Sequence, residues 1–261
     1  MESRLPSGLE KLITSHSGHI RHVSPAGGHM SDHTVFIESD RGTFFIKAMQ
    51  NRPGGRRDSL MREAAINKAL AGIAPKLRFQ TGDTDWVALG FDYVRSRHPD
   101  IGPGSQDLGR VMLLIDRIGG LVPPASTHDW VETRWDGYAD RPELLRGNAL
   151  LHTDLHPSNI LIGADQTCVV DWAWPTRGAG FIDPALFVIQ LIAAGHSPQQ
   201  AESWVSKCAA WRNASPAALH EFALASMRMQ ARMVERSPDT AWLQAMLDAC
   251  RRWFEYRHSK K

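Results

Sequence analysis

The chain has 261 residues, of which 43% are hydrophobic and 22% are charged, and these are the proportions of an ordinary globular protein with one large core or two lobes. Its formal net charge of +2 favours neither nucleic acid nor a membrane surface as a partner, and no stretch approaches the roughly 18 apolar residues of a membrane span. The first residues lack the apolar core of a signal peptide, and the three cysteines (Cys168, Cys208 and Cys250) lie in apolar or helical patterns. We therefore expect reduced core cysteines in a cytoplasmic protein.

The N-terminal part predicts a helix followed by an antiparallel sheet. Residues 5–13 form a short amphipathic pattern, and the β-branched and aromatic runs at 34–37 and 43–46 are typical of strands. The polar turn at 39–42, which contains a glycine, joins these two runs as a hairpin. A further strand is predicted over 86–94, where it leads into a polar loop.

A glycine-rich segment precedes the strand at 34–37. Gly27 and Gly28 let the backbone approach a polyanion, and successive backbone N–H groups can form an anion-binding nest there. Ser31 and Asp32 follow directly. Glycines between strands are more often simple turns, so this segment alone does not define a binding site.

Lys47 directly follows the predicted strand at 43–46, and Glu63 lies in a helix predicted over 60–70. Asp58 or Ser59 is expected to cap this helix, which places Glu63 in its first turn. A glutamate at this place suits the helix dipole, which is the alternative to a functional role.

The middle of the chain combines a helix with an acidic, aromatic segment. Apolar residues recur at helical spacing over 108–118, which predicts a helix with one buried face. Residues 127–145 then contain the acids Asp129, Glu132, Asp136, Asp140 and Glu143 among Trp130, Trp135 and Tyr138. This segment can receive a cationic sugar, or it can be a solvated face with aromatic anchors.

Short apolar runs and turns alternate over residues 149–184. Three runs predict brief buried strands, at 149–151, 160–162 and 168–170. The segment 164–167 is typical of the turn of a hairpin between the last two runs.

Three oxygen-bearing side chains are distributed around this predicted hairpin. Asp154 and Asn159 lie on the loop before it, and Asp171 lies at its far end. We expect the three side chains to converge on one place. Hard oxygen ligands in this number suit Mg²⁺, which prefers one or two carboxylates and leaves its other positions to water and phosphate.

The same stretch carries three motifs in a fixed order. Residues 152–159 form H-x-D-x-x-x-x-N, Asp171-Trp172 follows, and residues 180–185 form G-x-x-D-P-A. In these motifs the chain resembles the aminoglycoside phosphotransferase and choline kinase-like family, which has a protein kinase-like fold. Residues 28–32 are similar to the family's G-x-x-S-D phosphate loop. Thr153 departs from the family pattern, which most often has glycine at that position.

The resemblance implies a bilobal α+β protein kinase-like fold. An N-terminal lobe (1–92) would hold an antiparallel sheet with one main helix and bind the nucleotide, and a mainly helical C-terminal lobe (93–261) would carry the catalytic loop and the acceptor site. It also implies a kinase that transfers the γ-phosphate of ATP, with GTP as the alternative, to a hydroxyl of a small molecule with the help of Mg²⁺.

The resemblance further implies a role for each matching residue. Asp154 would accept or orient the proton of the substrate hydroxyl, and Asn159 and Asp171 would hold Mg²⁺. His152 and Asp183 would brace the loop. The nucleotide would be held by Lys47 with its partner Glu63, by Gly28 and Ser31 of the phosphate loop, and by Asp92 and Val94 of the hinge between the lobes.

The chain from Asp171 to Asp183 spans only 12 positions, which is too short for the platform on which a protein kinase seats a peptide. We therefore expect a small-molecule acceptor and no protein substrate. An aminoglycoside or related antibiotic is the leading class, and a choline-like or amino-sugar metabolite comes next. A polycation favours an acidic site, whereas the chain from Ala185 onward is basic overall.

Two alternatives to a kinase remain. A non-catalytic pseudokinase is disfavoured because Lys47, Asp154, Asn159 and Asp171 are all present. A zinc hydrolase would use His152 and His156, which are four positions apart as in the H-E-x-x-H helix. The match is poor, because the acid is not at the second position and Pro157 is a poor continuation of a helix.

Overall fold

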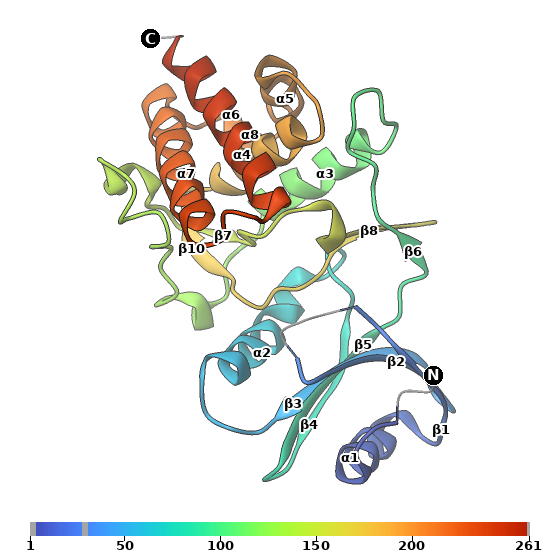
Figure 1. Ribbon diagram of the computed structural model, residues 1–261. Coiled ribbons are helices and arrows are strands. Elements are labelled where there is room, and N and C mark those ends of the chain that lie inside the picture. The colour runs from blue at the N-terminus through green and yellow to red at the C-terminus, as the bar shows by residue number, and fades with distance from the viewer. Residues whose placement is uncertain (1–3, 28–30, 260–261) are drawn as a thin grey trace. The chain divides into compact units, whose positions relative to one another are not determined.

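A computed structural model describes residues 4–27 and 31–259 (Figure 1). The chain divides into two compact units. The first unit comprises Met1–Ser96 together with Val170–Trp174, and the second comprises Arg97–Val169 and Pro175–Lys261. The division of functions at residue 92 stays a prediction; the compact units themselves change over at Ser96, within the short strand β6 (Ser96–Arg97).

The first unit is built on a five-stranded antiparallel sheet in the order β1-β2-β3-β5-β4. Its strands are β1 (Ile20–Pro25), β2 (His33–Ser39), β3 (Gly42–Gln50), β4 (Leu77–Gly82) and β5 (Trp86–Asp92). The predicted hairpin is present, with Phe36 opposite Phe45 and Thr34 opposite Lys47. Because side chains alternate along a strand, Phe45 and Lys47 lie on one face of β3 while Ile46 lies on the other.

Each face of this sheet has its own apolar core. On the face of Ile46, the helix α1 (Ser7–Ser17) buries Leu9 and Ile13 completely against the strands. Gly90 belongs to this face, and a side chain there would overlap the ring of Phe79, so the glycine lets that ring lie across β5. The helix α2 (Gly55–Ile66) covers the opposite face (Figure 1). Its Leu60 packs there in a second cluster of apolar side chains.

The predicted bounds of the helix around Glu63 were wrong. The helix α2 begins at Gly55 and ends at Ile66, and a 3₁₀ turn, η1 (Asn67–Leu70), completes it. Glu63 therefore lies beyond the first turn, and neither Asp58 nor Ser59 is the cap. The early start has a physical reason that the local sequence does not show, because Arg56 pairs with Asp32 at 2.8 Å and ties the first turn of the helix to the loop before β2.

The second unit is mainly helical. Its helices are α3 (Leu108–Gly119), α4 (Ile182–Ala193), α5 (Pro198–Val205), α6 (Ala209–Arg212), α7 (Pro216–Arg236) and α8 (Ala241–His258). Ser197 forms a capping box with Gln200 at the start of α5, and Ser215 caps α7. Ser237-Pro238 also resembles a helix start, but those residues form a turn, and Thr240 precedes the helix α8.

Short strands and 3₁₀ turns of the second unit hold the loop that carries Asp154. The strands are β7 (Ala149–Leu151), β8 (Ile160–Gly163), β9 (Thr167–Val169) and β10 (Thr176–Gly178), and the 3₁₀ turns are η2 (Ala125–Thr127), η3 (Pro142–Leu145) and η4 (Pro157–Asn159). Strand β7 pairs with β10, and β8 pairs with β9 through the predicted hairpin. The loop that begins at His152 therefore leaves one sheet and enters the other through η4 (Figure 1).

All three cysteines are buried, as expected of core residues. Within the described ranges, no helix has both the length and the apolar character needed to cross a lipid bilayer.

Candidate functional site

In the first unit, Lys47 bridges two carboxylates. Its Nζ donates to both oxygens of Glu63, at 3.0 and 2.8 Å, and to Oδ1 of Asp171 at 2.9 Å. The backbone N–H of Trp172 also donates to Glu63. The side chains of Lys47 and Glu63 are 13% and 7% exposed, whereas that of Asp171 is 39% exposed. The carboxylate of Asp171 thus remains accessible next to the buried ammonium group of Lys47.

The charges of this cluster reinforce one another. Burial disfavours the charged form of Lys47, but the two adjacent carboxylates more than offset this effect, so that the pKa of Lys47 is raised. The lysine is therefore a permanent cation at neutral pH. Asp171 has a φ of 64°, in the left-handed region that aspartate tolerates better than most residues.

The predicted phosphate loop is described only in part. Gly28 lies outside the described residues. Ser31 is half-buried just before β2, and the next residue, Asp32, accepts from the backbone N–H of Gln50 at 2.8 Å in addition to its ion pair with Arg56. The end of this loop is thereby attached to the end of β3 and to the start of α2.

The predicted hinge lies at the end of β5. Asp92 is the last residue of that strand and forms an ion pair with Arg78, and the backbone carbonyl of Val94 accepts from the hydroxyl of Ser96 at 3.1 Å. The backbone N–H of Asp92 donates to the backbone carbonyl of Lys76 at 2.9 Å. These contacts fix the backbone of the segment that the sequence assigned to nucleotide binding.

Sequence reasoning missed an aromatic face beside Lys47. Phe36 lies 5.3 Å from Phe45 and 5.2 Å from Tyr93, measured between ring centroids, and Phe45 lies 6.5 Å from Phe91. Phe45 shares the face of Lys47, and Phe36 and Phe91 are its cross-strand partners. The signal was present in the alternation of β3, because Phe45 and Lys47 are two residues apart.

In the second unit, the loop after β7 is held by Asp183. The carboxylate of Asp183 accepts from the backbone N–H groups of His152 and Thr153, both at 2.8 Å, and its residue is 2% exposed. The ring of His152 is also buried, and its Nδ1 accepts from the backbone N–H of Asp154 at 3.2 Å. His152 and Asp183 therefore lie where the sequence expected braces of the loop.

Asp154 and Asn159 face each other across this loop. Asn159 donates through Nδ2 to the backbone oxygen of Asp154 at 3.0 Å and to its carboxylate at 3.1 Å. The side chain of Asp154 is 65% exposed, and the ring of His156 lies 3.7 Å from its carboxylate. The adjacent ring of His156 is the main cause that lowers the pKa of Asp154. Asp154 is therefore an accessible, ionised carboxylate at neutral pH.

Burial raises the pKa of Asp183 to about 6, although the N–H groups of His152 and Thr153 oppose the shift. Between about pH 4 and pH 6 the native state therefore binds more protons at this residue than the unfolded chain does, so its contribution to stability falls as the pH rises through this window. We expect this residue to lower the free energy of unfolding by about 3 kcal/mol from the acidic to the neutral end.

Denaturant unfolding of the wild type and of Asp183→Asn across this pH range measures the effect. The variant is less stable at neutral pH, because its amide has one acceptor oxygen where the carboxylate has two. The difference in stability between the two proteins should widen as the pH falls from neutral toward pH 4, since only the wild type gains stability from protonation of this residue. A constant difference would contradict the assignment.

An ion pair with a buried carboxylate next to this loop was not predicted. Glu132 is 2% exposed and binds the guanidinium of Arg134, whose Nη2 also donates to the hydroxyl of Thr153. In the sequence, Glu132 is one of several acids of the 127–145 segment, and nothing in the local pattern distinguishes it from its exposed neighbours.

Each unit contains one side-chain oxygen, in Asn159 or in Asp171, that suits a hard cation. Asn159 uses Nδ2 toward Asp154, and Asp171 uses Oδ1 toward Lys47; among the hydrogen bonds between described residues, none reaches Oδ1 of Asn159 or Oδ2 of Asp171. An amide oxygen and a carboxylate oxygen are ligands that Mg²⁺ accepts. Residues 4–27 and 31–259 contain no cluster of three or more His, Cys, Asp or Glu side chains arranged for a metal.

The zinc alternative lacks its helix. His152 and His156 lie in an irregular segment before η4, so the pairing of side chains four residues apart on one helical face does not occur. Each ring instead lies next to Asp154. His152 accepts from the backbone N–H of Asp154, and His156 lies beside its carboxylate.

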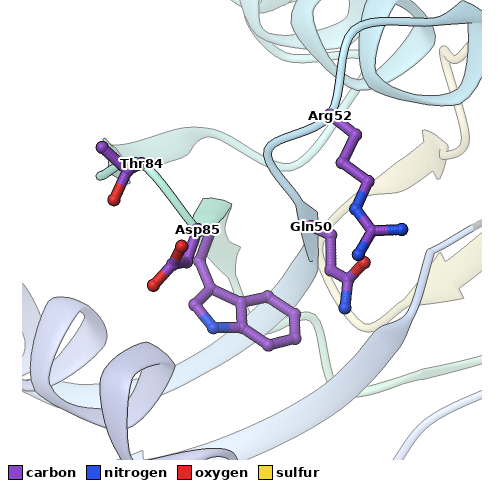
Figure 2. A pocket seen from close by; sticks show the side chains of 5 residues that line it. Gln50, Arg52, Thr84 and Asp85 are labelled. Carbon is purple, nitrogen blue, oxygen red and sulfur yellow. The ribbon is translucent and has the colours of Figure 1, made fainter.

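A small hollow in the first unit lies away from these residues. Figure 2 shows it at the ends of β3 and β5, where it is lined by Gln50, Arg52, Thr84, Asp85 and Trp86. Its volume of about 290 Å³ is at the lower limit for a site that encloses a small molecule. None of the predicted site residues lines it, so we assign it no part in the chemistry.

No family model matches the chain, and no curated protein matches its sequence. Solved structures match nearly all of it. A thermostable mutant of aminoglycoside phosphotransferase APH(4)-Ia is 13% identical, over 92% of this chain and 97% of that chain, with a TM-score of 0.59. Choline kinase LicA from Streptococcus pneumoniae is 13% identical, over 97% and 100% of the two chains, with a TM-score of 0.60.

A third structure, of a protein from Haemophilus somnus 129PT proposed to be a fructosamine-3-kinase, is 11% identical over 94% of this chain and 96% of that chain, with a TM-score of 0.60. These neighbours have the protein kinase-like fold that the motifs implied, and the antiparallel sheet of the first unit and the helices of the second confirm the predicted fold class. The chain therefore has the protein kinase-like fold, as found in aminoglycoside phosphotransferase APH(4)-Ia and choline kinase LicA.

Proposed function

We propose that the protein is a kinase that transfers the γ-phosphate of a nucleotide, ATP in the first instance, to a hydroxyl of a small molecule. The observation that carries this proposal is the buried lysine, Lys47, held between Glu63 and the accessible carboxylate of Asp171. A cation fixed next to an oxygen ligand is what a phosphate–metal site requires. The likeness in fold to kinases that act on small molecules supports it.

The residues of the first unit would hold the nucleotide. Lys47 offers a permanent positive charge to phosphate oxygens, and Glu63 fixes its direction. The aromatic face formed by Phe36, Phe45, Phe91 and Tyr93 offers apolar surface to the base, while backbone groups near Asp92 and Val94 can form hydrogen bonds with its edge. A structure of APH(4)-Ia contains ADP and hygromycin B, which supports nucleotide binding by this fold.

We propose that Asn159 and Asp171 are the ligands of Mg²⁺, through the oxygen atoms that accept no hydrogen bond within the described residues. Bound Mg²⁺ would neutralise charge on the phosphate oxygens and orient the γ-phosphate. The amide hydrogen bond from Asn159 to the main-chain oxygen of Asp154 fixes the direction of the Asn159 oxygen. The side chain of Asn159 would therefore bind the metal and at the same time contact Asp154, the proposed catalytic residue.

Asp154 would orient the acceptor hydroxyl and receive its proton. The oxygen of the acceptor forms a bond with the γ-phosphorus, the bond from that phosphorus to the bridging oxygen breaks, and the nucleoside diphosphate leaves. The low pKa of Asp154 makes it a weak base, so it acts chiefly by orienting the hydroxyl and accepts the proton as the P–O bond forms. Its 65% exposure leaves room for the acceptor.

The charges near this loop bear on the class of acceptor. In the 127–145 segment, the sequence left open a role in binding a cationic sugar, yet most of the acids are paired with arginine. These ion pairs are Glu132–Arg134, Asp136–Arg146, Asp140–Arg228 and Glu143–Arg141. Within the described chain, Asp129 is the one acid of the segment that forms no ion pair. A polycation would have to compete with an arginine at each pair.

We therefore place a neutral or singly charged hydroxyl compound, such as a choline-like or amino-sugar metabolite, ahead of a polycationic aminoglycoside as acceptor. A panel assay that couples nucleoside diphosphate release to a chromogenic reaction tests this order. Choline, fructosamine and glucosamine should give a higher kcat/KM than hygromycin B or another aminoglycoside. If an aminoglycoside gave a kcat/KM more than tenfold higher than any of these metabolites, the proposed order of acceptors would be reversed.

Thermal unfolding with nucleotides separates the donor question from the acceptor question. Mg-ATP should raise the Tm, because a ligand that binds only the native state stabilises it by mass action. A chelator should reduce the shift, and Mg-GTP provides the comparison between nucleotides. No shift with either nucleotide at millimolar concentration would contradict the proposed donor site.

A further inference from the structure

Thr153 has a backbone conformation that its side chain disfavours. Its φ is 65°, in the left-handed region, where a β-branched residue is strained by about 1–3 kcal/mol. The residue is 7% exposed and directly precedes Asp154, so its conformation sets the direction of the catalytic carboxylate. Glycine would adopt this conformation without strain.

Two kinds of contact hold Thr153 in this state. The first is the hydrogen bond from its backbone N–H to Asp183 at 2.8 Å, which any residue at this position can form. The second depends on the hydroxyl, because Oγ1 donates to the carbonyl of His152 at 2.6 Å and accepts from Nη2 of Arg134. Only serine or threonine can take part in the second kind.

Arg134 is itself held on several sides. Its Nε and Nη2 both donate to the carboxylate of Glu132, and its backbone N–H donates to the same carboxylate at 2.7 Å. Nη2 also lies 3.3 Å from the hydroxyl of Thr176 on β10, which in turn donates to Glu132. The guanidinium carbon lies 5.5 Å from the centre of the Trp135 ring. The guanidinium therefore has a fixed position against the loop.

We propose that Arg134 is a positioning residue that, supported by Glu132, holds Thr153 in its strained conformation and thereby orients Asp154 for phosphate transfer. This proposal rests on the proposed kinase function and extends it to residues outside the motifs that resemble those of the kinase family. Arg134 acts through Thr153 and does not contact the reacting atoms in this account. The contacts among Glu132, Arg134 and Thr153 connect the 127–145 segment to the catalytic loop. In this account the segment supports the conformation of that loop and does not bind a cationic sugar.

The test is a double-mutant cycle. Arg134→Lys retains a positive charge for Glu132 but lacks the second nitrogen with which arginine reaches Thr153 at the same time. Thr153→Gly removes both the strain and the hydroxyl. Arg141→Lys is the matched control, because Arg141 belongs to the same segment and its ion pair with Glu143 is exposed. The measured quantities are kcat, the KM for the nucleotide, and amide hydrogen exchange of the peptide that contains His152 and Thr153.

Arg134→Lys alone should lower kcat about tenfold, which corresponds to the loss of one hydrogen bond to a charged group, with no change in the nucleotide KM. In the Thr153→Gly background the same change should alter kcat by less than about twofold, since the bond it removes is already absent. Equal effects of Arg134→Lys in the two backgrounds, or an effect on the nucleotide KM alone, would overturn the proposal.

Two further tests separate the role of the Thr153 hydroxyl from other effects of the Arg134 substitution. Thr153→Val removes the hydroxyl without disturbing the ion pair of Arg134 and Glu132, and it should lower kcat as Arg134→Lys does, whereas Thr153→Ser should retain wild-type kcat. Hydrogen exchange does not depend on the reaction, so it is decisive even if the wild type transfers no phosphate and the proposed function fails. Exchange at His152 and Thr153 should accelerate in Arg134→Lys, and unchanged exchange would refute the positioning role independently of activity.

Discussion

Replacing Asp154 by alanine should lower kcat by about two to four orders of magnitude, the usual contribution of a general acid–base group. The variant loses the carboxylate that orients the acceptor hydroxyl, and it also loses one of the two hydrogen bonds of the Asn159 amide. The other bond of that amide goes to a main-chain oxygen, so the Asn159 side chain stays in place. The Tm shift caused by Mg-ATP should therefore survive.

Asp165→Ala is the matched control for this change. Asp165 is an exposed aspartate in the turn between β8 and β9 of the same unit, and its removal should leave kcat and Tm unchanged. Steady-state kinetics with the best acceptor and thermal unfolding with Mg-ATP measure the two expectations. If Asp154→Ala retained wild-type turnover, Asp154 would have no part in the chemistry.

The second large effect is expected at Lys47. Lys47→Met leaves Glu63 buried beside Asp171 without a cation, and breaking a buried ion pair by removal of one partner costs about 3–5 kcal/mol of stability. Burial already raises the pKa of Glu63, and Lys47 is the main group that opposes this shift, with help from the backbone N–H of Trp172. Without Lys47 the carboxyl group should be protonated at a higher pH than in the wild type.

The loss of stability in Lys47→Met should therefore shrink as the pH falls. The native variant binds a proton at Glu63 that the unfolded chain binds only at lower pH, so acid stabilises the variant relative to the wild type. Guanidinium unfolding at pH 5 and pH 8 measures this difference. Lys68→Ala, at an exposed lysine just after α2, is the control and should leave stability within about 0.5 kcal/mol of the wild type. A pH-independent deficit would contradict the assigned ion pair.

How far the sequence predicts this molecule depends on whether a feature is local. The hairpin of β2 and β3 and the buried face of α3 follow from alternation and helical spacing, and both are present as predicted. The start of α2 at Gly55 was missed; its first turn contacts Asp32 through Arg56, and these two residues are far apart in sequence. No periodicity within the helix carries that information.

The candidate site shows the same division. The spacing of Asp154 and Asn159 and the resemblance of Lys47 to a kinase lysine indicated two groups of residues, and the structure brings together the members of each group. The sequence also showed that Thr153 departs from the expected glycine. The sequence did not show that Arg134 supports the strained backbone of Thr153. That contact depends on Glu132, which is buried only in the tertiary structure.

Phosphorus NMR of the complete reaction tests the central claim most directly. With Mg-ATP and the best acceptor of the panel, the γ-phosphate resonance of ATP should decline while the resonance of a phosphate monoester of the acceptor grows in equal amount, and neither change should occur with Asp154→Ala or without Mg²⁺. Formation of inorganic phosphate in place of the ester, or ester formation at the wild-type rate by Asp154→Ala, would contradict the account.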